Sequence, residues 1–357
     1  FAGPTAGAVA AGLLVLTPDG GPRFLRLVAE GHTAPLTATL CLWAVDRHLA
    51  GRHTQALLLA TAFSLERPEA WPFLGAYAIW LWGREPARRP LVAGCLAAVP
   101  LLWFGGDLWG SGDPWHGADA AQVVSDSLGD RLALVWERVA KVVVTPAWVG
   151  ALAGVVTAWR RRERALLVLA AGALAWLALV GGMSIVLGYA ALSRFLLPAS
   201  AVLCVLAGVG VARIVAAPTQ RWAQVACALA LVAASLPFVV TRASSIGVVA
   251  DGVTARAHLE DDLDVVLAGA GGRDVVLACG RVAVSHSDVP RVAMAWKLDV
   301  PLHRVDRRLG ADPGVVFVRA GRSDDLALSE RPPDEVTELA RSDEWAAYAV
   351  ACDPRGT

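Results

Sequence analysis

The sequence predicts a mainly α-helical fold: a polytopic bundle of transmembrane helices followed by a small α/β domain. Of the 357 residues, 56% are hydrophobic and only 18% are charged, and the mean hydropathy is +0.52. This composition is typical of polytopic membrane proteins. Charge is also unevenly distributed, because the first 240 residues hold 31 charged residues and the last 117 hold 33. We therefore expect a transmembrane domain over residues 1–240 and a water-exposed domain over residues 241–357.

Apolar runs mark the expected spans. A helix needs about 20 apolar residues to cross about 30 Å of hydrocarbon. Full-length or shortened runs of this kind cover residues 1–16, 33–49, 54–83, 88–106, 143–159, 165–189, 195–214 and 223–240. They predict eight spans, or nine if the run 54–83 is divided into two half-helices.

The arginines predict the orientation of these spans. Cytoplasmic loops carry an excess of Lys and Arg, and the segment 160–164 holds four arginines. Further arginines lie at positions 47, 52, 84, 88 and 89, and all fall on one side only if the run 54–83 is split. Residues 17–32, residues 106–142 and the chain after Val240 then face outward. We expect a plasma-membrane protein whose C-terminal domain is extracytoplasmic.

A charged turn lies inside the run 54–83. Between Gln55 and Trp82 the only charged residues are Glu66, Arg67 and Glu69, and Pro68 and Pro72 flank the last of them. Proline removes a backbone donor and obstructs helix continuity, so the run is interpreted as two half-helices joined at a polar turn. Charge at membrane depth costs roughly 2.5–3.5 kcal/mol on insertion scales, so such groups pair, face water or bind a charged ligand.

A second arginine, Arg194, begins the run 195–214 on the same outward side as Arg67. Two guanidinium groups at this depth are suited to binding a phosphate or pyrophosphate at the level of the lipid headgroups. We expect both to contact the phosphate of a lipid-linked ligand. Two simpler interpretations stay open: Arg194 extends to the membrane surface without a ligand, and Arg67 forms an internal pair with a neighbouring glutamate.

Other outward residues are weaker candidates. Glu30 and His32 directly precede a span, and with Glu69 they are candidates to line an outer cavity. No His/Cys cluster has the spacing of a metal site. The formal net charge is zero and no basic run occurs, which argues against a nucleic-acid partner. Residues 131–142 have the pattern of an amphipathic helix lying on the membrane, or of a simple extension of the next span.

The last 117 residues predict a modest α/β unit. Short β-like runs cover 274–278 and 314–318, and a helical pattern covers 255–267. The glycine-rich run 269–272 precedes an expected strand, so it lacks the context of a phosphate-binding loop. Four cysteines lie in expected spans, whereas Cys279 and Cys352 lie in the outer domain, where they are candidates for a disulfide.

Taken together, residues 1–240 resemble the C superfamily of membrane glycosyltransferases, which use polyprenyl-phosphate sugars. Three features carry the resemblance: the turn Leu65-Glu66-Arg67-Pro68-Glu69, the outer loop with Ser111-Gly112-Asp113-Pro114, and Arg194-Phe195-Leu196-Leu197-Pro198, which is similar to the family's Arg-Tyr-x-x-Pro pattern. The resemblance implies a polyprenyl-phosphate sugar donor in a lipid membrane, with Arg67 and Arg194 at the donor phosphate. It also implies transfer with inversion to an acceptor outside the cytoplasm.

In that family an acidic residue in the first outer loop activates the acceptor, and no such loop is present here. The chain begins at Phe1 without the basic n-region of a signal peptide, so we expect the catalytic residue upstream of Phe1. We expect the full-length protein to be a hexosyl- or pentosyltransferase and this segment to be inactive. The resemblance leaves a divalent metal open as a cofactor of the full-length protein. A lipid-linked sugar transporter or flippase, and a non-catalytic membrane scaffold, are the rival functions.

Overall fold

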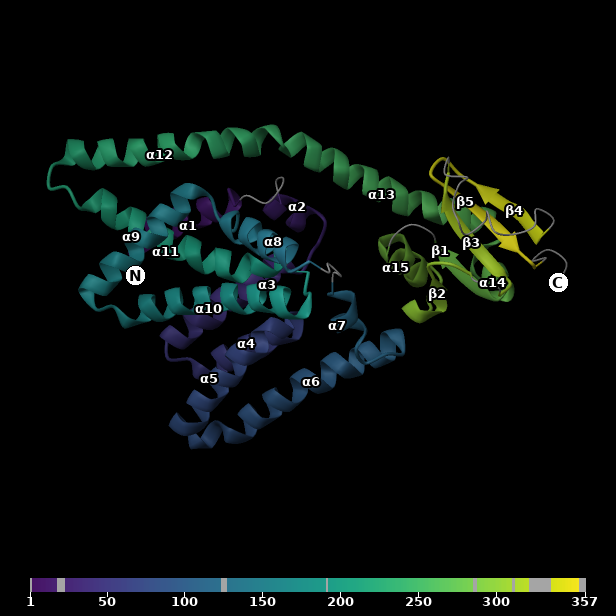
Figure 1. The fold of residues 1–357 in the computed structure, drawn as a ribbon, viewed down its shortest axis with the longest axis horizontal. Helices are drawn as coiled ribbons and strands as arrows, with labels where there is room; N and C mark the ends of the chain where they lie inside the picture. The colour runs from purple at the N-terminus through teal and green to yellow at the C-terminus, as the bar shows by residue number, and fades with distance from the viewer. Residues whose placement is uncertain are drawn as a thin grey trace. The chain divides into compact units, whose positions relative to one another are not determined.

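The structure is a computed structural model, and it describes residues 2–17, 23–122, 127–190, 192–284, 288–309, 312–320 and 335–352. It is mainly helical, with a small sheet near the C-terminal end (Figure 1). The chain divides into two compact units: residues 1–103 with 118–250, and residues 104–117 with 251–357. The boundary lies a little after the expected one at residue 241, and part of the expected outer loop groups with the C-terminal residues.

The first unit is a helical bundle. Its helices follow the predicted apolar runs closely, and the run 54–83 is divided as expected. In chain order they are α1 (Gly3–Val15), α2 (Arg23–Ala29), α3 (Ala34–Leu49), α4 (His53–Glu66), α5 (Trp71–Arg84), α6 (Arg89–Ser111), α8 (Leu128–Ala140), α9 (Thr145–Arg161), α10 (Arg164–Leu187), α11 (Leu197–Ala216) and α12 (Arg221–Ser244). Short 3-10 helices, η1 (Pro68–Ala70), η2 (Pro86–Arg88) and η3 (Ser193–Leu196), precede α5, α6 and α11.

Fewer helices than predicted are long enough to cross a membrane. Among the described residues four candidates meet the length and hydropathy of a span: residues 86–111, 164–187, 193–216 and 221–269. A fifth is obtained if α8 and α9, which meet at 77°, are counted as one broken span. The expectation of eight or nine spans is therefore not confirmed. The difference arises because α1, α3, α4 and α5 contain only 13, 16, 14 and 14 residues.

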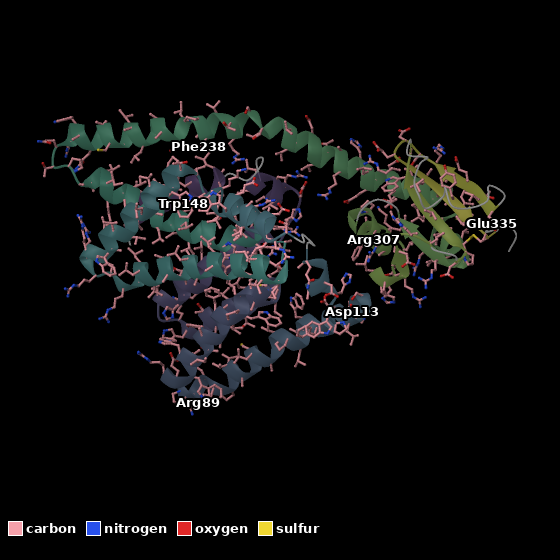
Figure 2. The ribbon with its side chains drawn as sticks, in the orientation of Figure 1. Arg89, Asp113, Trp148, Phe238, Arg307 and Glu335 are labelled. Atoms are coloured by element: carbon pink, nitrogen blue, oxygen red, sulfur yellow. A yellow bond between two sulfur atoms is a disulfide. The ribbon has the colours of Figure 1, made fainter. Side chains whose placement is uncertain are left out.

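Small residues allow α9 and α11 to pack at very short range. A Cβ added to Gly154 would overlap the carbonyl oxygen of Leu206, and one added to Gly210 would overlap the carbonyl oxygen of Gly150. Gly150 and Gly154 form the Gly-x-x-x-Gly spacing that lets helix backbones approach in membranes. The main core of the bundle surrounds α11, and Figure 2 shows Trp148 of α9 and Phe238 of α12, two partly buried side chains that pack against this core.

The C-terminal unit contains a five-stranded mixed sheet. Its strands are β1 (Arg281–Val284), β2 (Val305–Asp306), β3 (Gly314–Arg319), β4 (Val336–Arg341) and β5 (Trp345–Val350), in the spatial order β2-β1-β3-β5-β4. β1 is parallel to β2 and β3, whereas β5 is antiparallel to β3 and β4. The pairing of β4 with β5 is irregular between Glu338 and Ala340, which indicates a bulge in this edge strand.

Helices supply the partners of one face of this sheet. α13 (Ile246–Gly269), α14 (Gly272–Ala278) and α15 (Asp288–Lys297) contribute buried apolar side chains to the same core as β1, β3 and β5. Asp262 of α13 fixes the turn before β5, because its carboxylate accepts hydrogen bonds from the Ser342 hydroxyl at 2.7 Å and the Glu344 amide at 2.8 Å. The predicted helix over 255–267 and the predicted strand over 314–318 are both present.

The strand expected over 274–278 is wrong, because these residues form α14. The helix begins after Gly271, whose φ of +100° suits glycine, and it buries Val276 on one face. The glycine-rich run therefore precedes a helix and not a strand, but it follows α13, so it still lacks the strand that precedes a phosphate-binding loop.

The two cysteines of the C-terminal unit are joined in the structure. Cys279, at the end of α14, forms a disulfide with Cys352, which follows β5, and their Cα atoms are 5.7 Å apart. The bond joins residues 73 positions apart in the sequence. It connects a helix and a strand that both contribute to the same core.

Candidate functional site

The candidate site begins at the break between α4 and α5. Arg67 ends α4 in an extended conformation, with φ −143° and ψ 108°, and Pro68 then begins η1. Pro72 lies in the first turn of α5, where its missing N–H would have no helical partner in any case. The indole of Trp71 donates a hydrogen bond to the carbonyl oxygen of Ser64 at 3.0 Å across the break. The prolines thus allow a second helix to begin while the polar residues between the helices face inward.

Glu69 is the most deeply buried charged group at this break, with 1% of its surface exposed. One carboxylate oxygen, Oε1, accepts a hydrogen bond from the hydroxyl of Tyr189 at 2.5 Å. The other, Oε2, is buried and has no hydrogen-bond partner. Burial of an unsatisfied acceptor is costly, so native structures contain few such groups. The orphan oxygen marks Glu69 as a residue that a purely structural account does not explain.

The two predicted arginines meet at the ring of Phe195. The guanidinium carbon of Arg67 lies 4.7 Å from the ring centre, and that of Arg194 lies 5.4 Å from it. The ring of Tyr189 stacks on the same phenylalanine with 5.1 Å between centres. An aromatic ring attracts cations, so Phe195 is a shared platform for two like charges. The structure therefore brings together the two residues that the sequence analysis placed at one phosphate.

Neither arginine forms a direct ion pair, although the nearby charges of Glu69 and Glu66 attract Arg67. The Nε atoms of both Arg67 and Arg194 are buried without a hydrogen-bond partner. Within the described ranges, no carboxylate lies within the 4.0 Å ion-pair distance of either guanidinium. The internal pairing of Arg67 with a neighbouring glutamate, one of the simpler interpretations, is not formed. The site combines two positive groups and one buried carboxylate with hydrogen-bonding capacity left over.

A second set of contacts fixes the position of Phe195. The indole of Trp176, in α10, donates a hydrogen bond to the Phe195 carbonyl oxygen at 2.8 Å. Phe63 of α4 and Phe73 of α5 both contact the Trp176 ring, with centres 5.3 and 5.4 Å apart. Trp176 therefore links the two half-helices to the segment that carries Arg194.

An apolar cavity of about 760 Å³ lies within the same unit. Near the candidate site its wall includes Ala70 and Trp176, and at the other end it includes His48 and Arg164. Trp176 is twelve positions beyond Arg164 on α10, so the cavity follows that helix for about 18 Å at 1.5 Å per residue. Its remaining lining is largely aliphatic and aromatic, from α3, α4, α5, α10 and α11.

The other candidates lie elsewhere. Glu30 accepts a hydrogen bond from Arg26 at 2.8 Å, and His32 lies 3.1 Å from the second oxygen of the same carboxylate. Glu30, His32 and Glu69 do not belong to the lining of the apolar cavity. Ala70, which follows Glu69, does belong to it. The Ser-Gly-Asp-Pro motif forms a local turn after α6, where the carboxylate of Asp113 accepts a hydrogen bond from the Trp115 amide at 2.9 Å (Figure 2).

The sequence analysis missed Tyr189 and Trp176. Trp176 lies inside the apolar run 165–189 and Tyr189 lies at its end, and the run carries no other signal. Tyr189 bonds to Glu69, 120 positions away in the sequence, and Trp176 bonds to Phe195, 19 positions away. The one sequence feature that could have drawn attention to Tyr189 is that the chain has only three tyrosines. In the described part of the chain, no group of three or more His, Cys, Asp or Glu side chains is arranged to hold a metal ion.

Comparisons with protein-family models, with curated proteins and with solved structures gave no match.

Proposed function

We propose that this protein is an integral membrane glycosyltransferase that transfers a sugar from a polyprenyl-phosphate donor to an extracytoplasmic acceptor. The observation that carries the proposal is the meeting of Arg67 and Arg194 on Phe195, with both Nε atoms buried and unpartnered. Two unpaired guanidinium groups in a partly buried site favour a bound anion, because the anion supplies the missing acceptors. A phosphate is the anion whose geometry matches two guanidinium forks.

The apolar cavity supports a lipid as the carrier of that phosphate. The cavity passes close to the site at Ala70 and Trp176, and its lining accommodates hydrocarbon rather than a sugar. A polyprenyl chain placed there would leave its phosphate at the arginines. This arrangement explains why the apolar cavity and the two arginines lie close to the same residues, Ala70 and Trp176.

The proposed chemistry is a displacement at the anomeric carbon of the donor sugar. The acceptor hydroxyl forms the new C–O bond and loses its proton, while the bond between the sugar and the phosphate oxygen breaks. The polyprenyl phosphate then leaves with more negative charge than the donor phosphodiester carried. Arg67 and Arg194 would stabilise that developing charge, which is transition-state stabilisation by groups already in position. The group that accepts the proton is not assigned to any residue of this chain.

The proposed orientation places the site and the C-terminal unit outside the cytoplasm, at the plasma membrane. The arginines at 160–164 lie at the junction of α9 and α10, as expected of a cytoplasmic loop. A disulfide between Cys279 and Cys352 supports an oxidising compartment for the C-terminal unit.

A transporter of lipid-linked sugars is the alternative, and the cavity is the observation that favours it. The cavity reaches from the neighbourhood of the arginines to His48 and Arg164, which lie at the proposed cytoplasmic ends of α3 and α10. A lipid that moves between leaflets needs such a route. The two functions differ in outcome, since an enzyme cleaves the sugar from the phosphate and a transporter does not.

The test is binding of a polyprenyl-phosphate sugar to the purified protein, with Arg67→Ala and Arg194→Ala variants in the same detergent. Loss of a charge-assisted hydrogen bond costs about 1.5–3 kcal/mol, so each variant should bind roughly 10–100 times more weakly. Arg89→Ala is the matched control, because Arg89 also lies over an aromatic ring, that of Trp82, at the proposed cytoplasmic side (Figure 2). Unchanged binding in both site variants would refute the phosphate site.

A second measurement separates enzyme from transporter. With a donor radiolabelled in the sugar, a transferase releases polyprenyl phosphate and moves the label to an acceptor or to water. A transporter instead carries the intact donor across liposomes. Transport without cleavage would replace the proposed function with the alternative.

A further inference from the structure

Helix α8 has three different faces. Towards the protein, Arg131 donates a hydrogen bond to the Ile185 carbonyl oxygen at 3.3 Å, and Arg138 donates one to the Ser193 hydroxyl at 2.9 Å. A second face carries Leu132 and Trp136, one helical turn apart and 48% and 76% exposed. Successive helix positions differ by about 100°, so Glu137 begins a third face beyond Trp136.

The third face is polar. Glu137 and Lys141 form an exposed ion pair of 2.7 Å, and hydrogen bonding to Lys141 holds the pKa of Glu137 below its ordinary value. The side chains of Glu137 and Lys141 are 57% and 52% exposed. A helix that has protein on one side, exposed leucine and tryptophan on the next and an exposed ion pair on the third matches the boundary between hydrocarbon and water. Tryptophan is enriched at this level of a membrane.

The direction of α8 agrees with that location. α8 and α9 meet at 77°. α9 exposes its own apolar stripe, Val149, Leu152 and Val156, as expected of a helix that faces lipid along its length. If α9 crosses the bilayer, a helix at 77° to it lies nearly in the plane of the membrane.

We infer that α8 docks on the surface of the lipid bilayer through Leu132 and Trp136, and that this lipid contact supports the segment 185–193. Arg131 and Arg138 hold the two ends of that segment. Tyr189, the hydrogen-bond donor to Glu69, lies within it, and Arg194 follows it directly. The partner of α8 is therefore a phospholipid surface. The residues that α8 contacts in the protein connect it to the arginine site. The docking itself does not depend on the proposed function.

Photocrosslinking in liposomes tests the docking. The photoreactive residue p-benzoylphenylalanine is placed at position 136, or at position 137 as the matched control, in the full chain reconstituted in phosphatidylcholine. Illumination should give a lipid adduct by mass spectrometry at position 136 with a yield several-fold above that at position 137. The same residue at Leu152 of α9 is the positive control. Equal yields at positions 136 and 137, or no lipid adduct at 136, would overturn the inference.

Hydrogen exchange tests the connection to the site. In liposomes, the double variant Leu132→Ser with Trp136→Ser should speed backbone exchange in residues 185–193 relative to the wild type. Trp159→Ser is the matched control, because Trp159 is similarly exposed but lies in the last turns of α9. Unchanged exchange at 185–193, or an equal rise across all helices, would refute the connection. The crosslinking experiment uses single replacements, so its result does not depend on whether this double variant folds.

Discussion

Removal of one hydroxyl group should measure the contribution of the buried Glu69–Tyr189 bond. Tyr189→Phe keeps the ring that stacks on Phe195 and removes the donor that lies 2.5 Å from Glu69 Oε1. Because the second oxygen of Glu69 already lacks a partner, the variant leaves both oxygens of a buried carboxylate unsatisfied. A hydrogen bond to a charged group contributes about 1.5–3 kcal/mol, so we expect the free energy of unfolding to fall by that amount.

A double-mutant cycle with Glu69→Gln isolates what the negative charge of Glu69 adds to this bond. The amide oxygen of Gln still accepts from Tyr189, but a bond between neutral groups contributes only about 0.5–1.5 kcal/mol. Tyr189→Phe should therefore cost about 1 kcal/mol less in the Gln background than in the wild type, and this difference is the coupling energy. Equilibrium unfolding in mixed micelles with increasing dodecyl sulfate provides the four free energies.

The control for this cycle is Tyr77→Phe. The Tyr77 hydroxyl lies 3.3 Å from His48 Nδ1, a longer contact to a neutral or weakly basic partner in the same helical bundle. Its loss should cost clearly less than the loss of the Tyr189 hydroxyl. If Tyr189→Phe has no effect in either background, the buried carboxylate is not held by this bond and the geometry argued for the site is wrong.

Three further predictions concern packing, the disulfide and pH. Gly210→Ala should destabilise the bundle by about 1–3 kcal/mol in the same unfolding assay because its Cβ has no room, whereas Gly182→Ala, with no atom near its Cβ, should be neutral or stabilising. Cys279→Ser should lower the stability of the C-terminal unit by about 4 kcal/mol, through loss of a 73-residue loop closure, as shown by faster pulse proteolysis of that unit in urea in the full chain. Hydrogen bonding to Arg341 lowers the pKa of Glu338 below its ordinary 4.5, so its stabilisation is present above that pH and is lost as the pH falls through the lowered value. Hydrogen exchange of β4 and β5 should thus lose its difference between wild type and Glu338→Gln as the solution is acidified, and a difference that persists at low pH would contradict this.

The local features of the bundle could be predicted from sequence because they depend on neighbouring residues. Apolar runs located most helices, and Pro68 and Pro72 located the break between α4 and α5. The predicted number of spans was not confirmed, because the apolar residues of a run do not all belong to one long helix. The prediction of a strand over 274–278 was wrong because a short run rich in valine is compatible with a strand or a helix. Here the turn at Gly271 begins a helix.

Only the charged residues of the site could be predicted from the sequence. Arg67 and Arg194 stood out because charge in an apolar run is unusual, but no pattern showed that they share the ring of Phe195. The contacts of Tyr189 with Glu69 and of Trp176 with Phe195 join distant segments. Such pairs are set by how helices pack, and a single sequence contains no direct record of that packing.

The two edges of the C-terminal sheet have a consequence for self-association. An open strand edge can pair with the edge of another copy and start aggregation. Here one edge, β2, is only two residues long. The other, β4, is interrupted by a bulge and carries the charged residues Glu338 and Arg341. Both edges are thus poor templates for a further strand, which should allow neighbouring copies to remain separate even when they are crowded in one membrane.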